Sequence, residues 1–533
     1  MALTASIIAR PPRASPLAGL ALLAGLVVAL PLAGVVLAAL GDASADIAQR
    51  DLLRYAATSG LVALLVGVLT ALVGTAAAWL VVMHRFPGRD AFAWLLALPL
   101  AAPAFALAYA YADLLDVGGG LRTALRAATG HDLPFEMRSI GGAVFVLTAA
   151  FYPYVFLAMR AAFINQSVAA LEAATMLGCP RRQLLWRVAL PMARPALAAG
   201  VALAVMETLA DYGAVHFLSV QTLTTGVVRA WSVFGSTASA ARFALPLLAA
   251  AALLLWLERM SRRGRTHDNG KGRWRAIAPS ELGPVRRWLA FAACAMLLVL
   301  ALGLPLGWLA WQLPLAVPDW ARLTLALRNS AGMGLAGAMV TVALAMMLAL
   351  GTRQWPLAGR LASLGYATPG AVMAIGLLAP AGLIWSLVPG AGAGIALLLL
   401  VLAYAARLMA AALEPIDAGL ARVTPSMRHA ARTLGRGELG AAMAVDLPVA
   451  RGAMLTATLI LFVDILKELP ATMILRPFNF DTLAVLASNY ALDERLNQAG
   501  LPALLIVAMA MPAVIWLTRR IDGARPGALN AAA

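Results

Sequence analysis

The chain has 533 residues, of which 62% are hydrophobic and only 12% are charged. Soluble globular proteins contain roughly 45–50% apolar and about 25% charged residues, so this composition excludes an ordinary water-soluble enzyme. The formal net charge is +16, and all basic residues except Lys271 and Lys467 are arginines. In so apolar a chain, this excess is typical of loops held on the cytoplasmic side of a membrane and does not indicate a nucleic-acid surface.

Apolar runs of about 20 residues recur along the whole chain, separated by short charged stretches. A helix of about 20 residues crosses the roughly 30 Å of hydrocarbon in a bilayer. The sequence therefore predicts an all-α integral membrane protein with twelve transmembrane helices. The expected spans lie near residues 17–40, 55–83, 91–115, 140–162, 195–217, 243–257, 288–312, 329–352, 361–386, 391–413, 452–475 and 499–518.

The first run follows Arg10 and Arg13 and is too long for the apolar core of a signal peptide, so we interpret it as a retained span. Twelve spans place both termini on the same side of the membrane. Most of the 41 basic residues fall in the loops on that side. Because cytoplasmic loops are enriched in arginine and lysine, both termini are expected in the cytoplasm.

A basic stretch at residues 259–287 separates the sixth expected span from the seventh. It divides the chain into a first half, residues 1–258, and a second half, residues 288–533, with six spans each. Its arginines and glycines indicate a solvated cytoplasmic linker that also contacts anionic membrane lipid. Binding to nucleic acid is the less favoured alternative.

The two halves are related by an internal repeat, which is clearest at an offset of 257 residues. This offset aligns Gly178 with Gly435, Leu177 with Leu434, Leu190 with Leu447, Pro191 with Pro448, Arg194 with Arg451, Glu207 with Asp464, Asp211 with Glu468 and Thr225 with Thr482. Earlier in the halves, Ser59 corresponds to Ser330 and the helix-breaking Pro103 to Pro369. Because each half has an even number of spans, the repeats are parallel, and a translocation path between them is expected.

The loop between the fourth and fifth spans carries a distinctive pattern. A helix is expected over residues 169–177, ended by Gly178 and Pro180, with a second short helix over residues 181–188. An amphipathic loop at the membrane surface is the simplest interpretation. However, the same spacing recurs at residues 429–448, and this recurrence favours a shared function on the cytoplasmic face.

These loops resemble the signature of permease subunits of binding-protein-dependent ABC importers, which is Glu-Ala-Ala, three residues, Gly, and later Leu-Pro. The residues that match in the first half are Glu172, Ala173, Ala174, Gly178, Leu190 and Pro191. The corresponding residues in the second half are His429, Ala430, Ala431, Gly435, Leu447 and Pro448. Histidine replaces the usual glutamate at position 429, so we expect the two loops to make unequal contacts.

The resemblance implies a type I ABC importer permease in the bacterial inner membrane. It implies that both loops dock, as coupling helices, against two copies of a cytoplasmic ATPase, and that a periplasmic substrate-binding protein delivers the cargo. ATP would be used by the partner, and no cofactor is expected on this chain. Neither Lys271 nor Lys467 lies in a Gly-Lys-Ser/Thr sequence, so the chain has no P-loop and is not expected to be an enzyme.

Four acidic residues fall within or at the ends of expected spans: Glu207 and Asp211 in the fifth, and Asp464 and Glu468 in the eleventh. Residues four apart share one face of a helix. Carboxylates at such depth cost a few kcal/mol each unless paired or hydrated, so they are expected to face the protein interior or a water-filled vestibule, and they mark a candidate translocation path. The alternative is structural pairing with neighbouring helices, including a local pair between Lys467 and Glu468.

Several segments also resemble the ferric-iron branch of this family, which includes fused permeases of two halves. These segments are residues 207–213, 221–231, 464–472 and 475–483. The resemblance implies ferric iron as the cargo, and a carboxylate-lined path suits a hard cation. The alternatives are a permease for thiamine, polyamine, sulfate or phosphonate, a twelve-span ion-coupled secondary transporter, and, last, a membrane enzyme. No metal ligand is assigned, because the five histidines are scattered.

Overall fold

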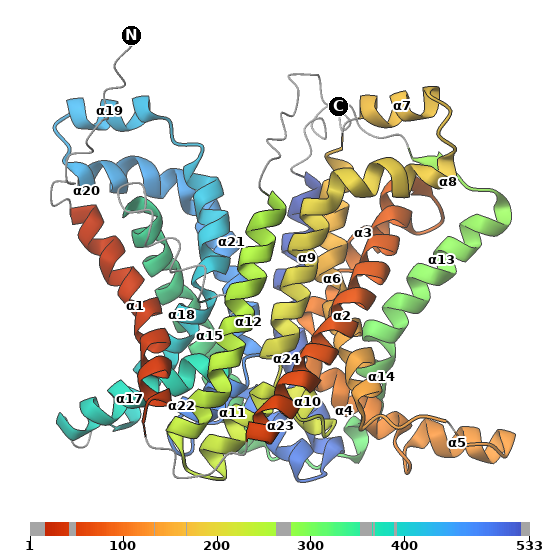
Figure 1. Ribbon diagram of the computed structural model, residues 1–533, viewed down its shortest axis with the longest axis horizontal. Coiled ribbons are helices and arrows are strands. Elements are labelled where there is room, and N and C mark those ends of the chain that lie inside the picture. Colours follow the sequence, from red (N-terminus) through yellow and green to blue (C-terminus); the bar gives the residue numbers. More distant parts are fainter. Residues whose placement is uncertain are drawn as a thin grey trace.

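The computed structural model describes residues 16–41, 49–132, 134–166, 168–262, 279–351, 365, 368–387 and 392–523. These residues form a bundle of long helices with short helices at its upper and lower ends (Figure 1). Strands in the described ranges are limited to β1 (His84–Arg85) and β2 (Ser280–Glu281), which pair in parallel. The predicted all-α fold is therefore confirmed.

The elements follow each other in the same general order in the two halves. In the first half they are α1 (Pro16–Ala39), α2 (Gln49–Met83), α3 (Arg89–Leu95), η1 (Leu98–Ala101), α4 (Ala104–Leu115), α5 (Gly120–Thr129), α6 (Ile140–Ile164), α7 (Val168–Met176), α8 (Arg181–Leu184), η2 (Leu185–Ala189), α9 (Leu190–Ala210), α10 (Gly213–Phe217), α11 (Leu223–Ser232) and α12 (Thr237–Arg262). In the second half they are α13 (Pro284–Leu298), η3 (Val299–Gly303), α14 (Leu304–Gln312), η4 (Leu313–Leu315), α15 (Trp320–Gly351), α17 (Gly370–Leu387), α18 (Gly392–Leu420), α19 (Pro425–Thr433), α20 (Glu438–Ala441), η5 (Ala442–Asp446), α21 (Leu447–Leu466), α22 (Pro470–Leu475), α23 (Leu483–Leu492) and α24 (Leu496–Gly523).

Ten helices among the described residues are long and apolar enough to cross a membrane. The helical segments on either side of Pro103 are together apolar and long enough for one more span, which would be broken at Pro103, because they meet at 90°. The expected span at residues 361–386 lies partly outside the described residues, and its described part is the shorter helix α17. The outer face of α1 exposes Leu22, Leu26 and Leu37 by 48% to 67%, as a surface in contact with lipid requires.

The first helix of each half packs against the other half. Helix α1 packs against α15, α17 and α18, while α13 and α14 contact α3 and α4 (Figure 1). Where α1 crosses α17, a Cβ atom on Gly34 would lie 1.9 Å from the carbonyl oxygen of Gly376, so only glycine permits this approach. On the other side, the indole of Trp308 donates a 2.6 Å hydrogen bond to Asp113. Each half thus completes its bundle with a helix of the other.

A serine fixes the start of a short helix at the lower face in each half. The Ser59 hydroxyl accepts a 2.8 Å bond from the amide of Leu223, and the Ser330 hydroxyl accepts a 2.7 Å bond from the amide of Leu483. The N-caps of these helices are Thr222 in α11 and Thr482 in α23. The predicted alignment of Thr225 with Thr482 is therefore wrong. The segment from Glu468 to Thr482 is three residues longer than the segment from Asp211 to Thr222, and an ungapped alignment cannot accommodate such an insertion.

The basic linker at residues 259–287 falls largely outside the described residues, which resume at residue 279. Its end is attached to the first half through β2. The Ser280 hydroxyl lies 2.9 Å from Nδ1 of His84 and donates a 3.1 Å bond to the carbonyl oxygen of Met83. The second half therefore begins from a fixed point beside the end of α2.

Candidate functional site

The two loops with the repeated pattern have the same backbone path. Helices α7 and α8 and the π turn η2 correspond to α19, α20 and η5 at an offset of 257 residues. In both loops a glycine follows the first helix in the left-handed region, with φ of +82° at Gly178 and +79° at Gly435. The amide of Cys179 bonds back to the carbonyl oxygen of Ala174 at 2.9 Å, and the second loop has the equivalent bond. Glycine meets the steric demand of this helix ending.

The Leu-Pro pairs occupy the junction between each loop and the span that follows it. Leu190 and Pro191 are the first residues of α9, and Leu447 and Pro448 are the first residues of α21. A π turn precedes each pair. Because proline has no N–H to donate to the preceding turn, a wider turn lets the helix continue into the membrane. Each loop is thus joined to its span by uninterrupted helix.

The remaining pattern residues lie on the first helix of each loop. Glu172, Ala173 and Ala174 are on α7, and His429, Ala430 and Ala431 are on α19. Both loops lie at the upper edge of the bundle in Figure 1, at opposite ends of the picture. They expose large apolar side chains at matching positions, which are Leu177 (88% exposed) with Leu434 (81%) and Trp186 (63%) with Met443 (70%). Two similar apolar surfaces therefore face away from the bundle.

The four predicted membrane carboxylates line one cavity between the halves, with a volume of about 70 Å³. Glu207 lies on α9 and Asp464 on α21, while Asp211 and Glu468 follow the ends of these helices. The segment around Pro103 also contributes to the wall, with residue 100 and residues 102–105. A cavity of this size has room for only a few water molecules.

Two cations pair with these carboxylates. The Lys467 ammonium lies 2.9 Å from Oδ1 of Asp464 and donates a 3.3 Å bond to the carbonyl oxygen of Leu100 at the helix break. The predicted local pair of Lys467 with Glu468 is therefore wrong, because residues three apart on a helix face each other and adjacent residues diverge. Glu468 instead contacts the guanidinium of Arg407 from α18.

The sequence reasoning missed Arg407, which lies within the expected span at residues 391–413. Its Nη2 atom lies 3.5 Å from Oε2 of Glu207, so the guanidinium contacts a carboxylate from each half. A signal was available, because an arginine inside a membrane span needs a partner. These pairs are the kind of contact that the structural alternative predicts for the carboxylates.

Two of the carboxylates also cap short helices. Oδ1 of Asp211 accepts bonds of 3.0 and 3.1 Å from the amides of Ala214 and Val215 in α10. Oε1 of Glu468 accepts a 3.3 Å bond from the amide of Ala471 in α22. Helix N-termini have unpaired N–H groups and a partial positive charge, which stabilise carboxylates.

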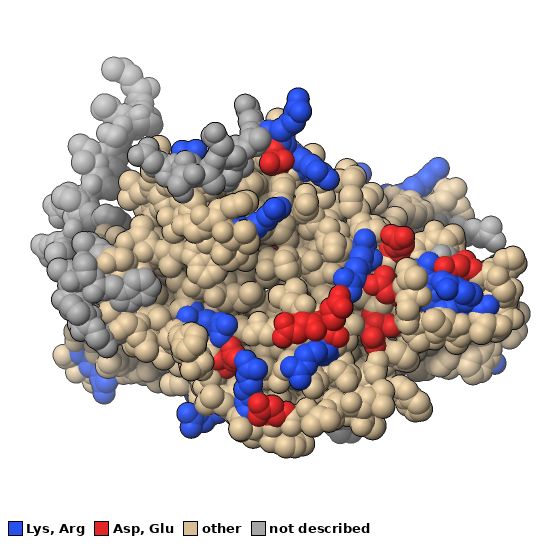
Figure 2. Space-filling view, turned by 90° about the horizontal axis from the view of Figure 1, so that it is seen from below, with Lys and Arg blue, Asp and Glu red and all other residues tan. Residues whose placement is uncertain are grey.

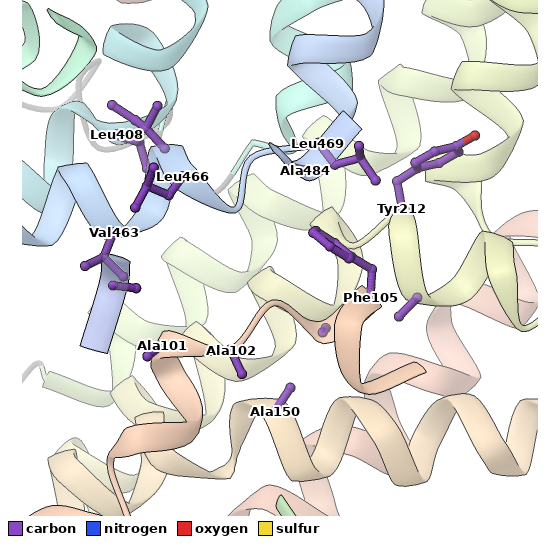
Figure 3. Close-up of a cluster of buried hydrophobic side chains, with 14 of the residues drawn as sticks. Ala101, Ala102, Phe105, Ala150, Tyr212, Leu408, Val463, Leu466, Leu469 and Ala484 are labelled. Carbon is purple, nitrogen blue, oxygen red and sulfur yellow. The ribbon is translucent and has the colours of Figure 1, made fainter. Parts of the chain in front are cut away.

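An apolar layer lies beside the cavity, next to α10 and α22. Figure 3 shows Phe105, Tyr212 and Leu469, which come from three separate elements and approach one another. A Cβ atom on Gly213 would lie 2.8 Å from Cβ of Phe105 and 3.0 Å from Cδ2 of Leu469. The layer is thus tightly packed, and both halves contribute to it.

Beyond Tyr212 lies a second pocket of about 410 Å³, whose polar lining includes Tyr55, His216 and Arg229. Tyr212 lines both this pocket and the central cavity, and its ring stacks on that of His216 with centroids 4.9 Å apart. Within the described ranges, no three histidine, cysteine, aspartate or glutamate residues are arranged to hold a metal ion.

The lower face of the bundle carries interspersed acidic and basic side chains near its centre and right side (Figure 2). Ion pairs account for several of these charges. Arg122 lies 2.6 Å from Asp132, Arg138 lies 2.8 Å from Asp116, and Asp481 is bound by Arg476. The hydrogen bond to Asp132 and the nearby acidic side chains raise the pKa of Arg122, although burial opposes the shift.

Comparison with known proteins relates these features to a family. Residues 63–267 match the family described as "Binding-protein-dependent transport system inner membrane component". The chain is 23% identical over 445 residues to the Fe(3+)-transport system permease protein FbpB 2 of Haemophilus influenzae, covering 81% of this chain and 83% of that protein. This match agrees with the resemblance indicated by the two loops.

Shorter matches come from permeases of other transport systems. The sulfate transport system permease protein CysT of Salmonella typhimurium is 31% identical over 159 residues, which are 30% of this chain and 56% of that protein. The molybdenum transport system permease protein ModB of Escherichia coli is 28% identical over 195 residues, which are 35% of this chain and 84% of that protein.

Proposed function

We propose that this chain belongs to the family of binding-protein-dependent transport system inner membrane components and is the fused permease of an ATP-driven importer. The observation that carries the proposal is the pair of matching loops, each with a left-handed glycine and the same two exposed apolar positions. Exposed large apolar patches mark sites of protein interaction. We assign these surfaces, with the pattern residues of α7 and α19, to docking of two copies of a cytoplasmic ATPase.

Continuous helix gives each loop a mechanical connection to the central cavity. From the first loop, α8 and η2 lead directly into α9, a helix of 21 residues that carries Glu207 and ends beside Asp211. From the second loop, α20 and η5 lead into α21, which carries Asp464. A helix of this length spans about 30 Å. When ATP binding draws the two ATPases together, movement of the loops is thereby transmitted to the proposed translocation path.

The membrane orientation follows from this assignment. The loops lie at the upper end of the bundle in Figure 1, so we assign that end to the cytoplasm, and an even number of spans would place both termini on the same side. The opposite end, with α5, α11 and α23, faces the periplasm and receives a substrate-binding protein. ATP is hydrolysed by the partner chain, since this sequence has no P-loop.

Transport in this scheme proceeds by alternating access. Tyr212, which lies in the apolar layer with Phe105 and Leu469, lines both the central cavity and the second pocket, so we assign this layer as the gate on the periplasmic side. The layer is built from both halves, so a rocking motion of the halves would part it. Cargo would then enter from the pocket beside Tyr212 and leave toward the cytoplasm after the halves return.

For the cargo we favour ferric iron. Four carboxylates and two cations line the cavity, so its formal charge is negative, and oxygen-rich surroundings suit a hard cation. The similarity to an Fe(3+)-transport permease over most of the chain supports the same assignment. The second candidate is an oxyanion such as sulfate, which Arg407 and Lys467 would bind; the shorter matches to sulfate and molybdenum permeases favour it.

Replacing Gly178 and Gly435 with valine tests the docking assignment. A β-branched side chain at a φ near +80° distorts the loop, so association with the ATPase should be lost while the spans still insert. Gly437→Val is the matched control, because Gly437 lies in the same loop at a φ of −66° and a Cβ there meets nothing within 4 Å. Wild-type association by the double variant would refute the assignment.

Uptake into membrane vesicles tests the energy source and the cargo. Uptake should require ATP, the ATPase and the binding protein, and it should be observed with iron rather than sulfate. Uptake driven by a proton gradient without an ATPase would instead indicate a secondary transporter.

A further inference from the structure

We propose that Arg407 is a charge lock between the two halves, which a multivalent cation opens by replacing the guanidinium at Glu207. The inference rests on the proposed function, because it assigns a gating and selectivity role to a residue in the proposed path. Three observations carry it: the contacts of Arg407, the charges around it and the space available.

The two carboxylates that Arg407 contacts are not equivalent. Glu468, from the same half, is only 4% exposed at its side chain and is also held by the amide of Ala471. Glu207, from the other half, is 26% exposed, and its Oε2 atom lies 3.5 Å from Nη2 of Arg407. The pair with Glu468 is therefore the fixed one. The contact with Glu207 joins the halves and is the one that can open.

The charges around Arg407 favour a cation as its competitor. The carboxylates facing the cavity are those of Glu207, Asp211, Asp464 and Glu468, from the ends of α9 and α21. The other cation, Lys467, already contacts Asp464 and the carbonyl oxygen of Leu100. Charge interactions are strong in surroundings of low dielectric constant. A multivalent cation is thus attracted to Glu207 more strongly than a single guanidinium, whereas the four carboxylates repel an anion.

The cavity is too small for the Arg407 guanidinium and a multivalent ion to contact Glu207 at the same time. About 70 Å³ remains beside the Arg407 side chain, which is only 13% exposed. A hydrated multivalent ion needs more room than a few water molecules occupy. The ion can reach Glu207 only when the guanidinium moves away toward Glu468. Cargo arrival and release of the contact between the halves therefore become a single event, which couples cargo to the motion of the halves.

The experiment uses the full-length chain in lipid nanodiscs without partner proteins and Tb³⁺ as the cation. Tyr154 and Tyr212 line the cavity and can sensitise Tb³⁺ luminescence. Removing the competing charge in Arg407→Gln should raise Tb³⁺ affinity about tenfold over wild type. Arg407→Lys keeps the charge and should stay near wild type. Arg328→Gln, which removes an exposed arginine of α15 away from the cavity, should also match wild type.

Second variants keep the test decisive. Adding Glu207→Gln to Arg407→Gln should cancel the gain in Tb³⁺ affinity. If Arg407→Gln does not fold, Glu207→Gln alone provides the test, and it should weaken Tb³⁺ binding. Unchanged Tb³⁺ affinity in a folded Arg407→Gln variant would overturn the proposal. Sulfate binding that is present in wild type and lost in this variant would also overturn it, since Arg407 would then bind an oxyanion. Because no ATPase is used, failure of loop docking leaves this result unaffected.

Discussion

Residues 168–191 and 425–448 follow the same path from helix to left-handed glycine to π turn, but different interactions hold them in this arrangement. In the second loop, the Arg428 guanidinium binds the carboxylate of Asp446, which is 3% exposed. The residue of the first loop that corresponds to Asp446 is Ala189, whose carbonyl oxygen accepts a 2.7 Å bond from the side-chain Nε2 of Gln166. A charged pair thus holds one loop, and a neutral hydrogen bond helps to hold the other.

The comparison separates two kinds of constraint on a repeated loop. The backbone path depends on the glycine and on the turn before the Leu-Pro pair, and these are identical in the two copies. The attachment depends on side chains that the copies do not share. The two loops also differ at one pair of exposed positions, where Glu172 of the first loop corresponds to His429 of the second. We therefore expect the two loops to move alike but to open at different free energies.

The largest effect is expected from Asp446→Ala. It leaves the partly buried Arg428 guanidinium without its partner, and such changes cost about 3 kcal/mol or more. Amide hydrogen exchange should report a fall of about this size in the opening free energy of α19, with α7 unaffected. Equal protection of α19 in the variant and in wild type would mean that the ion pair does not hold the loop.

The shared backbone is tested by alanine at each left-handed glycine. Gly178→Ala and Gly435→Ala should each destabilise their loops by about 1–2 kcal/mol, because a Cβ atom disfavours a positive φ. Near-equal losses, measured by hydrogen exchange of α7 and α19, would sharpen the comparison. Gly437→Ala provides the baseline, and a large difference between the two glycine variants would contradict a common backbone constraint.

A smaller effect is expected from Gln166→Leu in the first loop. This change removes the donor to the carbonyl oxygen of Ala189, and a neutral hydrogen bond contributes about 1 kcal/mol. Hydrogen exchange of the amides near η2 should accelerate by the factor that corresponds to about 1 kcal/mol. This acceleration should be smaller than the one expected for the second loop in the Asp446→Ala variant. An effect as large as that of Asp446→Ala would contradict the expectation that the hydrogen bond of the first loop contributes less than the ion pair of the second.

The smallest effect concerns the partner. His429→Glu restores the residue found at position 172, so it should make the two docking contacts more alike. If the carboxylate accepts a hydrogen bond from the ATPase, affinity should rise severalfold, as expected for about 1 kcal/mol. Binding of the purified ATPase to the variant in nanodiscs measures this, and weaker binding than wild type would show that histidine is the better fit.

Several features of the site were accessible from the sequence because they are local. Gly178 and Gly435 could be recognised as helix ends, and Glu207 and Asp464 as carboxylates within membrane spans, from residues a few positions away. The partner of Lys467 was mistaken, because adjacency in sequence was given more weight than helical geometry. Arg407 was overlooked although its position in a span required a partner. The equivalence of Thr222 and Thr482 was hidden by a three-residue insertion between Glu468 and Thr482.

The sequence by itself determined that the chain spans a membrane and that one loop design occurs twice. Membrane spans are recognised from the hydropathy of about 20 neighbouring residues, and a helix end from the glycine that follows the helix. Neither prediction therefore depends on contacts between distant parts of the chain. Tertiary structure alone decided that α1 packs on the second half and that four carboxylates share one cavity with Arg407. These outcomes depend on how helices that are hundreds of residues apart fit together, and the packing of surfaces is not encoded in any single segment.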